Sequence, residues 1–191
     1  MSVTLYDKSL SDKLQSWTQK SDIHVYSPED SKKLLEVLID ETGDKPVKLP
    51  FISLSRAGGY NILNKNKKPM TYDGATVDAT IEKSVILNAI PISITYQIDV
   101  WARFMEEADE IMRNLVYNII NYEKILIKIP YAGYELPHQS SIRIITDVLD
   151  NSNAFPQISR GQFSRLSLGI VIDDAYLWDT RIRNNIEILV N

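Results

Sequence analysis

The feature that most constrains this chain is a strict alternation of apolar and polar side chains over residues 90–101. The apolar positions are Ile90, Ile92, Ile94, Tyr96, Ile98 and Val100. Alternation at every second residue is typical of a β-strand that buries one face. At about 3.3 Å per residue this strand would be roughly 35 Å long, about twice the usual length. We therefore expect part of it to extend beyond the domain that packs on it.

The hydrophobic period then becomes helical. The apolar residues are Ala108, Ile111, Met112, Leu115, Val116 and Ile119. This spacing of three or four residues marks one face of a helix, and Glu106 and Glu107 lie in the first turn, where the helix dipole favours negative charge. We predict a helix at about 103–120, ending near Asn121, and a strand at 125–129. A strand and a helix that are each apolar on one side bury those sides when the helix lies across the sheet.

Further strands are predicted from shorter apolar runs. Their ranges are 23–26, 49–55, 142–149, 163–172 and 182–190. The segments between the later strands, 130–139, 150–161 and 173–180, are expected to be connections. Since no second helix is predicted between those strands, a mostly antiparallel sheet is favoured. The sequence thus predicts an α+β fold whose sheet is backed by one long helix at about 103–120 and by N-terminal helices.

Residues 1–22 are polar, with one weak helical face. That face consists of Leu10, Leu14 and Trp17. Ser9 or Ser11 is a candidate cap for this first helix.

A second helix is predicted to begin with Ser27 as its cap and Pro28 in its first turn. Gly43 is expected to end it. Its buried side is expected to hold Leu34, Leu35, Leu38 and Ile39.

The least regular stretch is 56–84, which is too long for an idle connection and is expected to be a hairpin, an arm or an interaction loop. The length of 191 residues fits one domain, 1–191. In that domain the helix within 1–22 and the 56–84 arm are expected to be peripheral.

Composition excludes several classes of protein. The absence of cysteine rules out a disulfide scaffold, a thiolate zinc site and a cysteine nucleophile. Residues 1–10 do not resemble a secretory signal, and no apolar run approaches the roughly 18 residues of a membrane helix. We expect no membrane association.

Charge argues against sequence-specific DNA binding. The net charge is −4, with a pI near 5.2, whereas proteins that grip phosphates usually carry a basic excess. The one dense cluster, Lys65, Lys67 and Lys68, lies in a loop-like stretch and is interpreted as a solvated turn. Mild acidity would suit a surface that DNA slides past without sticking.

No catalytic, cofactor or metal site is predicted. The two histidines, His24 and His138, have no partner at metal-ligand spacing. Adjacent carboxylates such as Asp173 and Asp174 point to opposite faces of a strand, so one site cannot easily use both. The glycines of the turn at 56–59 lack the lysine or the third glycine of a phosphate-binding loop. They are interpreted as a turn that needs a positive φ.

Aromatic and arginine residues in predicted loops are the candidate interface residues. They are Arg56, Tyr60, Tyr131, Tyr134, Phe155, Arg160, Tyr176, Trp178 and Arg181. Each on its own is as readily a local core residue, but together they match the enrichment of Tyr, Trp and Arg at protein–protein interfaces.

The sequence IPISITYQIDVWAR at 90–103, followed by EEADE at 106–110, resembles the core of tail-terminator and tail-completion (neck) proteins of tailed bacteriophages. In that family a strand with the pattern Y-x-I-D-V-W leads into a helix that begins E-E-A-D. The resemblance implies a small α+β domain that forms hexameric rings, which cap the tail tube and join it to the head.

The resemblance further implies a virion protein of the tail or neck, made in the cytoplasm of the bacterial host. Its expected partners are other copies of itself, the tail tube, the sheath and neck or connector proteins, with DNA only passing through a lumen. A connector, head-completion or baseplate protein is an alternative. So is a small enzyme that uses Asp173 or His138, or a cytoplasmic adaptor outside the virion.

Overall fold

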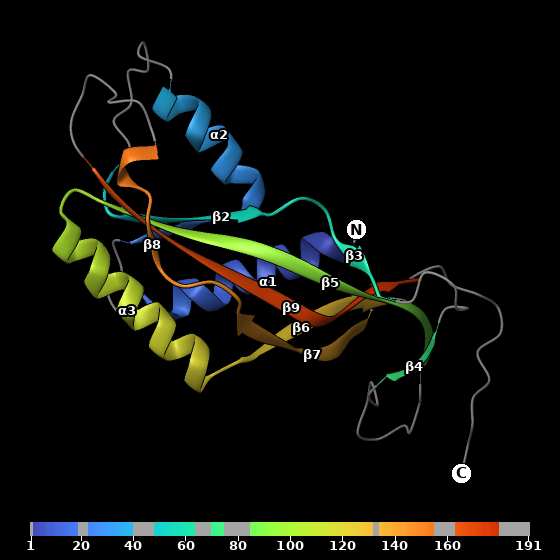
Figure 1. The fold of residues 1–191 in the computed structure, drawn as a ribbon. Helices are drawn as coiled ribbons and strands as arrows, with labels where there is room; N and C mark the ends of the chain where they lie inside the picture. Colours follow the sequence, from blue (N-terminus) through green and yellow to red (C-terminus); the bar gives the residue numbers. More distant parts are fainter. Residues whose placement is uncertain are drawn as a thin grey trace.

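The protein has a mixed α+β fold built on a curled, mostly antiparallel sheet, as the computed structural model shows (Figure 1). The parts of the chain that the structure describes are residues 2–18, 23–39, 48–63, 70–74, 85–131, 134–154 and 163–179.

The main sheet has the strand order β1-β2-β5-β9-β7-β6. These strands are β1 (His24–Tyr26), β2 (Phe51–Arg56), β5 (Val85–Ala102), β9 (Ser164–Trp178), β7 (Tyr134–Ile144) and β6 (Lys124–Tyr131). Short strands β3 (Asn61–Ile62) and β4 (Met70–Gly74) pair with β5, and β8 (Leu149–Asp150) pairs with β9. Among the described strand pairs, β1 with β2 is the parallel one, so the predicted antiparallel character is confirmed.

The long strand β5 is the centre of the sheet. It has 18 residues and pairs with the 15-residue β9 from Ala89 to Ala102. The even-numbered side chains from Ile92 to Val100 are fully buried, as the alternation predicts. Along its other edge β5 pairs in turn with β4, β3 and β2. The length of β5 therefore allows it to pair with three strands along this edge. The first residues of β5 curve away from the helices together with β4 (Figure 1).

Within the described residues, three α-helices accompany the sheet, α1 (Ser2–Trp17), α2 (Pro28–Ile39) and α3 (Met105–Asn121), with a short 3-10 helix at Ser152–Ala154. α1 begins at Ser2, so Ser9 and Ser11 lie inside the helix and the predicted cap is wrong. α3 has 17 residues and α1 has 16, so the sheet is not backed by one dominant helix.

The buried face of α3 is the predicted one, because Ala108, Ile111, Met112, Leu115 and Ile119 all point into the core. α1 also belongs to the main core through Tyr6, Leu10 and Leu14, which are fully buried, although the sequence places it at the periphery.

At the start of α2, the Ser27 hydroxyl accepts a hydrogen bond from the Asp30 amide at 3.3 Å, which confirms the predicted cap. The side chains at 34–39 and the predicted stop at Gly43 lie outside the described part of the chain.

Two predicted connections are strands. Residues 130–131 end β6 and residues 134–139 begin β7, which pairs with β6 in the antiparallel direction. Its alternation is hidden because polar His138 and Ser140 occupy inward positions beside Leu136. The segment 173–178 continues β9, and the strand predicted at 142–149 is interrupted, because β7 ends at Ile144. The predicted strand at 182–190 lies outside the described residues.

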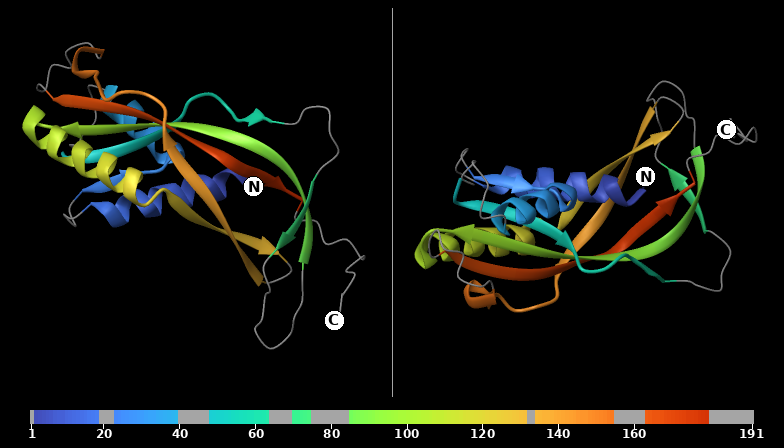
Figure 2. Two further views of the ribbon diagram at one scale, coloured as in Figure 1. Left: turned by 60° about the horizontal axis from the view of Figure 1, so that its bottom comes forward. Right: turned by 90° about the horizontal axis from the view of Figure 1, so that it is seen from above.

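The two faces of the sheet are covered differently. The main core joins the even side of β5 to residues of α1 and α3. A smaller cluster on the other face stacks Phe51 against Trp101, with ring centroids 5.7 Å apart, and adds Phe163. In the view from above, β8 lies on the side of the sheet opposite α1 (Figure 2).

Candidate functional site

The residues predicted to form interfaces are scattered over the fold. Tyr60 is exposed in the loop between β2 and β3, and Arg56 ends β2 with a partly exposed side chain. Tyr131 and Trp178 are buried in the main core. Tyr176 is half-buried beside Trp178, with ring centroids 5.2 Å apart.

Of the remaining four, Tyr134 begins β7, but its side chain is outside the described part. Phe155, Arg160 and Arg181 lie outside the described residues altogether. The structure thus brings together Tyr176 and Trp178 and leaves Tyr60 and Arg56 on the surface. Whether any of the nine meets a partner stays a prediction.

Arg56 is tied into the fold by a polar contact with α1. Its Nε lies 3.4 Å from Oδ1 of Asp7, and the Tyr96 hydroxyl donates to the same oxygen at 2.9 Å. Burial raises the pKa of Asp7, while the hydrogen bond from Tyr96 and the Arg56 charge partly offset this. The guanidinium therefore has a structural role at the end of β2, in addition to any contact with a partner.

A buried polar cluster forms where β7 separates from β9. The backbone ladder between these strands covers only Ile142 to Ile144. Beyond it, side chains supply the missing hydrogen bonds of β9. Ser140 Oγ donates to the Asp174 carbonyl at 3.2 Å, and the Tyr176 amide donates to the Tyr6 hydroxyl at 2.8 Å. Burial raises the pKa of Tyr6 to about 12.

His138 lies in the same cluster, and its Nε2 is 3.0 Å from Ser140 Oγ and 3.3 Å from the Asp174 carbonyl oxygen. We assign the proton to Nε2, because a carbonyl oxygen can only accept a hydrogen bond. Burial lowers the pKa of His138, partly offset by the carbonyl and the charge of Asp174. The imidazole is therefore neutral near pH 7.

This cluster does not have the geometry of a Ser–His–Asp catalytic site. The serine hydroxyl is fully buried, and a protonated Nε2 cannot act as its general base. The Asp174 carboxylate accepts a hydrogen bond from the Ser141 amide at 2.7 Å instead of orienting the imidazole. The side chains of this cluster provide hydrogen bonds to the backbone of β9 at the point where β7 no longer pairs with it.

A second buried polar cluster spans β2, β5 and β9 on the opposite face. Asp99 and Arg165 form an ion pair at 3.0 Å, and both side chains are largely buried. Ser167 donates to Asp99, and the Arg165 guanidinium lies 4.8 Å from the centre of the Trp101 ring. Trp101 Nε1 donates to Ser53 Oγ at 2.8 Å. These contacts fix adjacent strands in register.

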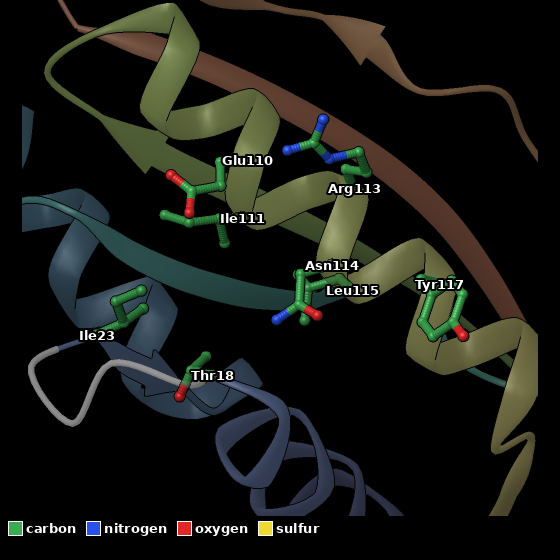
Figure 3. Close-up of a pocket in the computed structure, with 8 residues that line it drawn as sticks. All are labelled: Thr18, Ile23, Glu110, Ile111, Arg113, Asn114, Leu115 and Tyr117. Carbon is green, nitrogen blue, oxygen red and sulfur yellow. The ribbon is translucent and has the colours of Figure 1, made fainter.

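The described surface has three hollows along α3. One, of about 660 Å³, borders the first turns of the helix beside Lys48 and Glu106, and the other two lie further along it. The second hollow, of about 370 Å³, lies where α3 meets the end of α1 and the start of β1 (Figure 3). Asn114 faces the end of α1 there and donates to the Trp17 carbonyl at 2.9 Å, while the Arg113 guanidinium points away. We interpret this hollow as the seam between two packed helices.

The third hollow, of about 530 Å³, lies between the C-terminal half of α3 and the β7–β8 connection. We call it the α3 groove, and its apolar lining includes Val116, Ile120, Ile142, Ile144, Val148 and Leu168. Ile120 is 67% exposed and Val148 is 43% exposed. The sequence offers one signal for it, because Ile120 is an apolar residue on the outward side of the predicted helix.

Within the described residues, no group of three or more His, Asp or Glu side chains is placed to hold a metal ion. No helix there is long and apolar enough to cross a membrane. Comparison with protein-family models and with curated proteins found no match. The surfaces themselves must therefore carry the argument about function, and the α3 groove with its exposed apolar rim is the candidate site.

Proposed function

We propose that this chain is a structural virion protein of a tailed phage, a tail-terminator or neck subunit. In this proposal it forms a homomeric ring, expected to be a hexamer, that joins the tail tube and sheath to the head. Another connector, head-completion or baseplate station is the alternative within the same class. The resemblance at 90–110 suggests the family, and the exposed apolar surface suggests the mode of action.

The observation that carries the proposal is the apolar rim of the α3 groove. Two of the residues that line the groove, Ile120 and Val148, are large hydrophobic residues with exposed side chains. Exposed apolar side chains gathered in a hollow of the surface usually mark a binding surface. A subunit that works by fitting to neighbours needs such a surface and needs no catalytic centre.

Two further features support a ring subunit. The β4 end of the sheet extends away from the helices (Figures 1 and 2), where it can reach adjacent subunits. The first turn of α3 carries exposed Glu106, and the chain is acidic overall. Negative charge on a lumen wall would repel DNA phosphates and let DNA pass.

The test is assembly in the presence of the expected partner. Purified protein, alone and mixed with tail tubes of the same phage, is examined by native mass spectrometry and electron microscopy. We expect closed rings, either free or seated on the tube end. Protein that stays monomeric at high concentration and forms no ring with tail tubes would refute the proposal. Mass spectrometry of purified virions distinguishes it from a cytoplasmic adaptor, which would not be found there.

A further inference from the structure

The outer edge of β6 is a second surface to which a partner could bind. β6 is the last strand in the strand order, and among the described strands it pairs with β7 alone. Ile125, Ile127 and Ile129 are buried in the same core as residues of α1, so the strand is held in position. An edge strand presents a row of backbone N–H and C=O groups to which another extended chain can add.

The pairing with β7 determines which backbone groups of β6 face outwards. The Ile142 amide donates to the Glu123 carbonyl at 2.7 Å. In an antiparallel pair, residues that hydrogen-bond to the partner strand alternate with residues that do not. In the continuous register of this pair, the N–H and C=O groups of Leu126 and Lys128 therefore point to the open edge. Pro130 falls on the same outward series, where its missing N–H removes no hydrogen bond to β7.

The opposite edge of the sheet is closed by a side chain. Gln15 Nε2 of α1 donates to the Ile23 carbonyl at 2.8 Å, and the Val25 amide of β1 donates to Gln15 Oε1 at 2.9 Å. One amide side chain thus makes hydrogen bonds that another strand would make with β1. Among the described residues, no side chain makes such bonds to the outward backbone groups of Leu126 and Lys128. The edge at β1 is therefore closed, whereas the edge at β6 is open.

The side chains beside the open edge indicate what kind of strand fits. Leu126 is 50% exposed, and Lys124 and Lys128 flank it on the same exposed face. Lys124 lies 3.8 Å from Glu123. Lys128 lies 2.9 Å from Glu135 on β7, across β6 from the open edge. Both are pairs of exposed side chains, which are weak, so acidic residues opposite the lysines and an apolar residue opposite Leu126 would give favourable cross-strand pairs.

A second copy of β6 does not have that pattern. Antiparallel pairing of two β6 strands about Leu126 places Lys124 of each copy opposite Lys128 of the other, and like charges directly opposite each other are destabilising. We propose that the outer edge of β6 binds an extended segment of a different protein by strand addition. The segment has an apolar residue with an acidic residue two positions before it and two positions after it. The inference goes beyond the proposed ring and does not depend on it.

The test uses the isotope-labelled full-length chain, with a synthetic peptide as the probe. The end-blocked peptide TDTVTDT places its two aspartates on the same side as its central valine. Hydrogen exchange of single amides is followed by NMR with and without excess peptide. We expect the Leu126 and Lys128 amides to exchange several-fold more slowly with the peptide, because each gains a carbonyl partner. The Ile125 and Ile127 amides, which bond to β7, should not change.

Two control peptides separate backbone pairing from charge. In the first, a methyl group on the valine nitrogen removes a donor to the edge, and we expect no protection. In the second, TKTVTKT, lysines replace the aspartates, and we expect several-fold less protection. Since the chain is acidic overall, its net charge would favour TKTVTKT, so a preference for TDTVTDT must come from the local lysines. A Lys124→Glu/Lys128→Glu variant, changed at two exposed positions, should reverse the preference, and circular dichroism verifies that it is folded.

The outcomes separate the inference from the proposed function. Absence of protection by TDTVTDT, or equal protection by the methylated peptide, overturns the inference. So does equal protection by TKTVTKT. If the Leu126 and Lys128 amides are protected without peptide and lose that protection on dilution, a second copy occupies the edge and the inference is wrong. Ring formation with tail tubes is measured separately, so the ring proposal stands or falls on its own result.

Discussion

The two buried polar clusters on β9 hold it to its neighbours in different ways. At the Asp99–Arg165 cluster the backbone ladder between β5 and β9 is complete, and Asp99 lies directly opposite Ser167. At the His138–Ser140 cluster the ladder to β7 has stopped, and neutral side chains take its place. The first cluster adds an ion pair to strands whose backbone hydrogen bonds are complete. The second cluster provides side-chain hydrogen bonds in place of missing backbone ones.

This difference predicts how much stability is lost when one side chain is removed from each cluster. Loss of a member of the charged cluster leaves an uncompensated charge in a buried position. Loss of a member of the neutral cluster leaves a backbone group without its hydrogen bond. The first loss is the more expensive, since a buried unpaired charge costs more than a buried unpaired amide or carbonyl.

The largest effect is expected for Asp99→Ala. It leaves the buried Arg165 guanidinium without its carboxylate, and removal of one partner of a buried pair costs about 3–5 kcal/mol. Urea-induced unfolding measures the loss. The matched control is Asp173→Ala, which breaks the exposed pair with Arg143 at 2.6 Å and should cost about 0–1 kcal/mol. Similar losses in the two variants would contradict the assignment of Asp99 to a buried network.

A smaller effect is expected for Tyr6→Phe at the neutral cluster. The change removes the hydroxyl that accepts the Tyr176 amide, and a buried donor left unsatisfied costs about 1–3 kcal/mol. Tyr117→Phe removes a hydroxyl from an exposed residue and serves as the control. If Tyr6→Phe unfolds at the same urea concentration as the native protein, side chains do not replace the ladder at this point.

The same contrast explains which parts of the fold the sequence could predict. The alternation at β5 and the helical spacing at α3 are long and uninterrupted, so both elements were predictable. β7 was not, because His138 and Ser140 occupy buried positions where apolar residues would reveal a strand. Those residues are polar because they form hydrogen bonds with the backbone of β9, which is distant in the sequence. A pattern within β7 alone cannot reveal that contact.

Residue type alone does not distinguish a surface residue from a core residue. Tyr131 and Trp178 are candidate interface residues by type, yet within one chain both are buried. The α3 groove combines Ile120 of the helix with Val148 of a later connection, and such a pair becomes visible only once the fold brings the two segments together. The sequence could show that Ile120 is on the outward side of its helix, but not that a second apolar segment lies beside it.

A pH dependence distinguishes the neutral cluster further. Burial lowers the pKa of His138 below its ordinary 6.5, so below that pH the unfolded chain binds a proton that the folded protein resists. The contribution of His138 to stability is complete above pH 6.5 and is lost as the pH falls towards the folded pKa. His138→Gln should flatten this part of the profile of unfolding free energy against pH. An unchanged slope would show that the imidazole is not held neutral.

Asp7 must be separated from this effect, because burial raises its pKa. A carboxyl group with a raised pKa takes up its proton more readily in the folded protein, so it adds stability as the pH falls, the opposite sign to His138. The comparison between the native protein and His138→Gln cancels the Asp7 contribution, since both chains contain it. The difference between the two profiles therefore isolates the histidine.

The smallest effect on stability, and the largest on assembly, is expected for Ile120→Glu. The side chain is 67% exposed, so the unfolding free energy should change by no more than about 0.5 kcal/mol. The added carboxylate lies in the apolar groove and would have to be desolvated in any contact there, so ring formation should be lost. Leu126→Glu, an exposed apolar residue outside the groove, should leave rings intact. If Ile120→Glu assembles as well as Leu126→Glu, the two clusters still hold the fold together, but the groove is not where subunits meet.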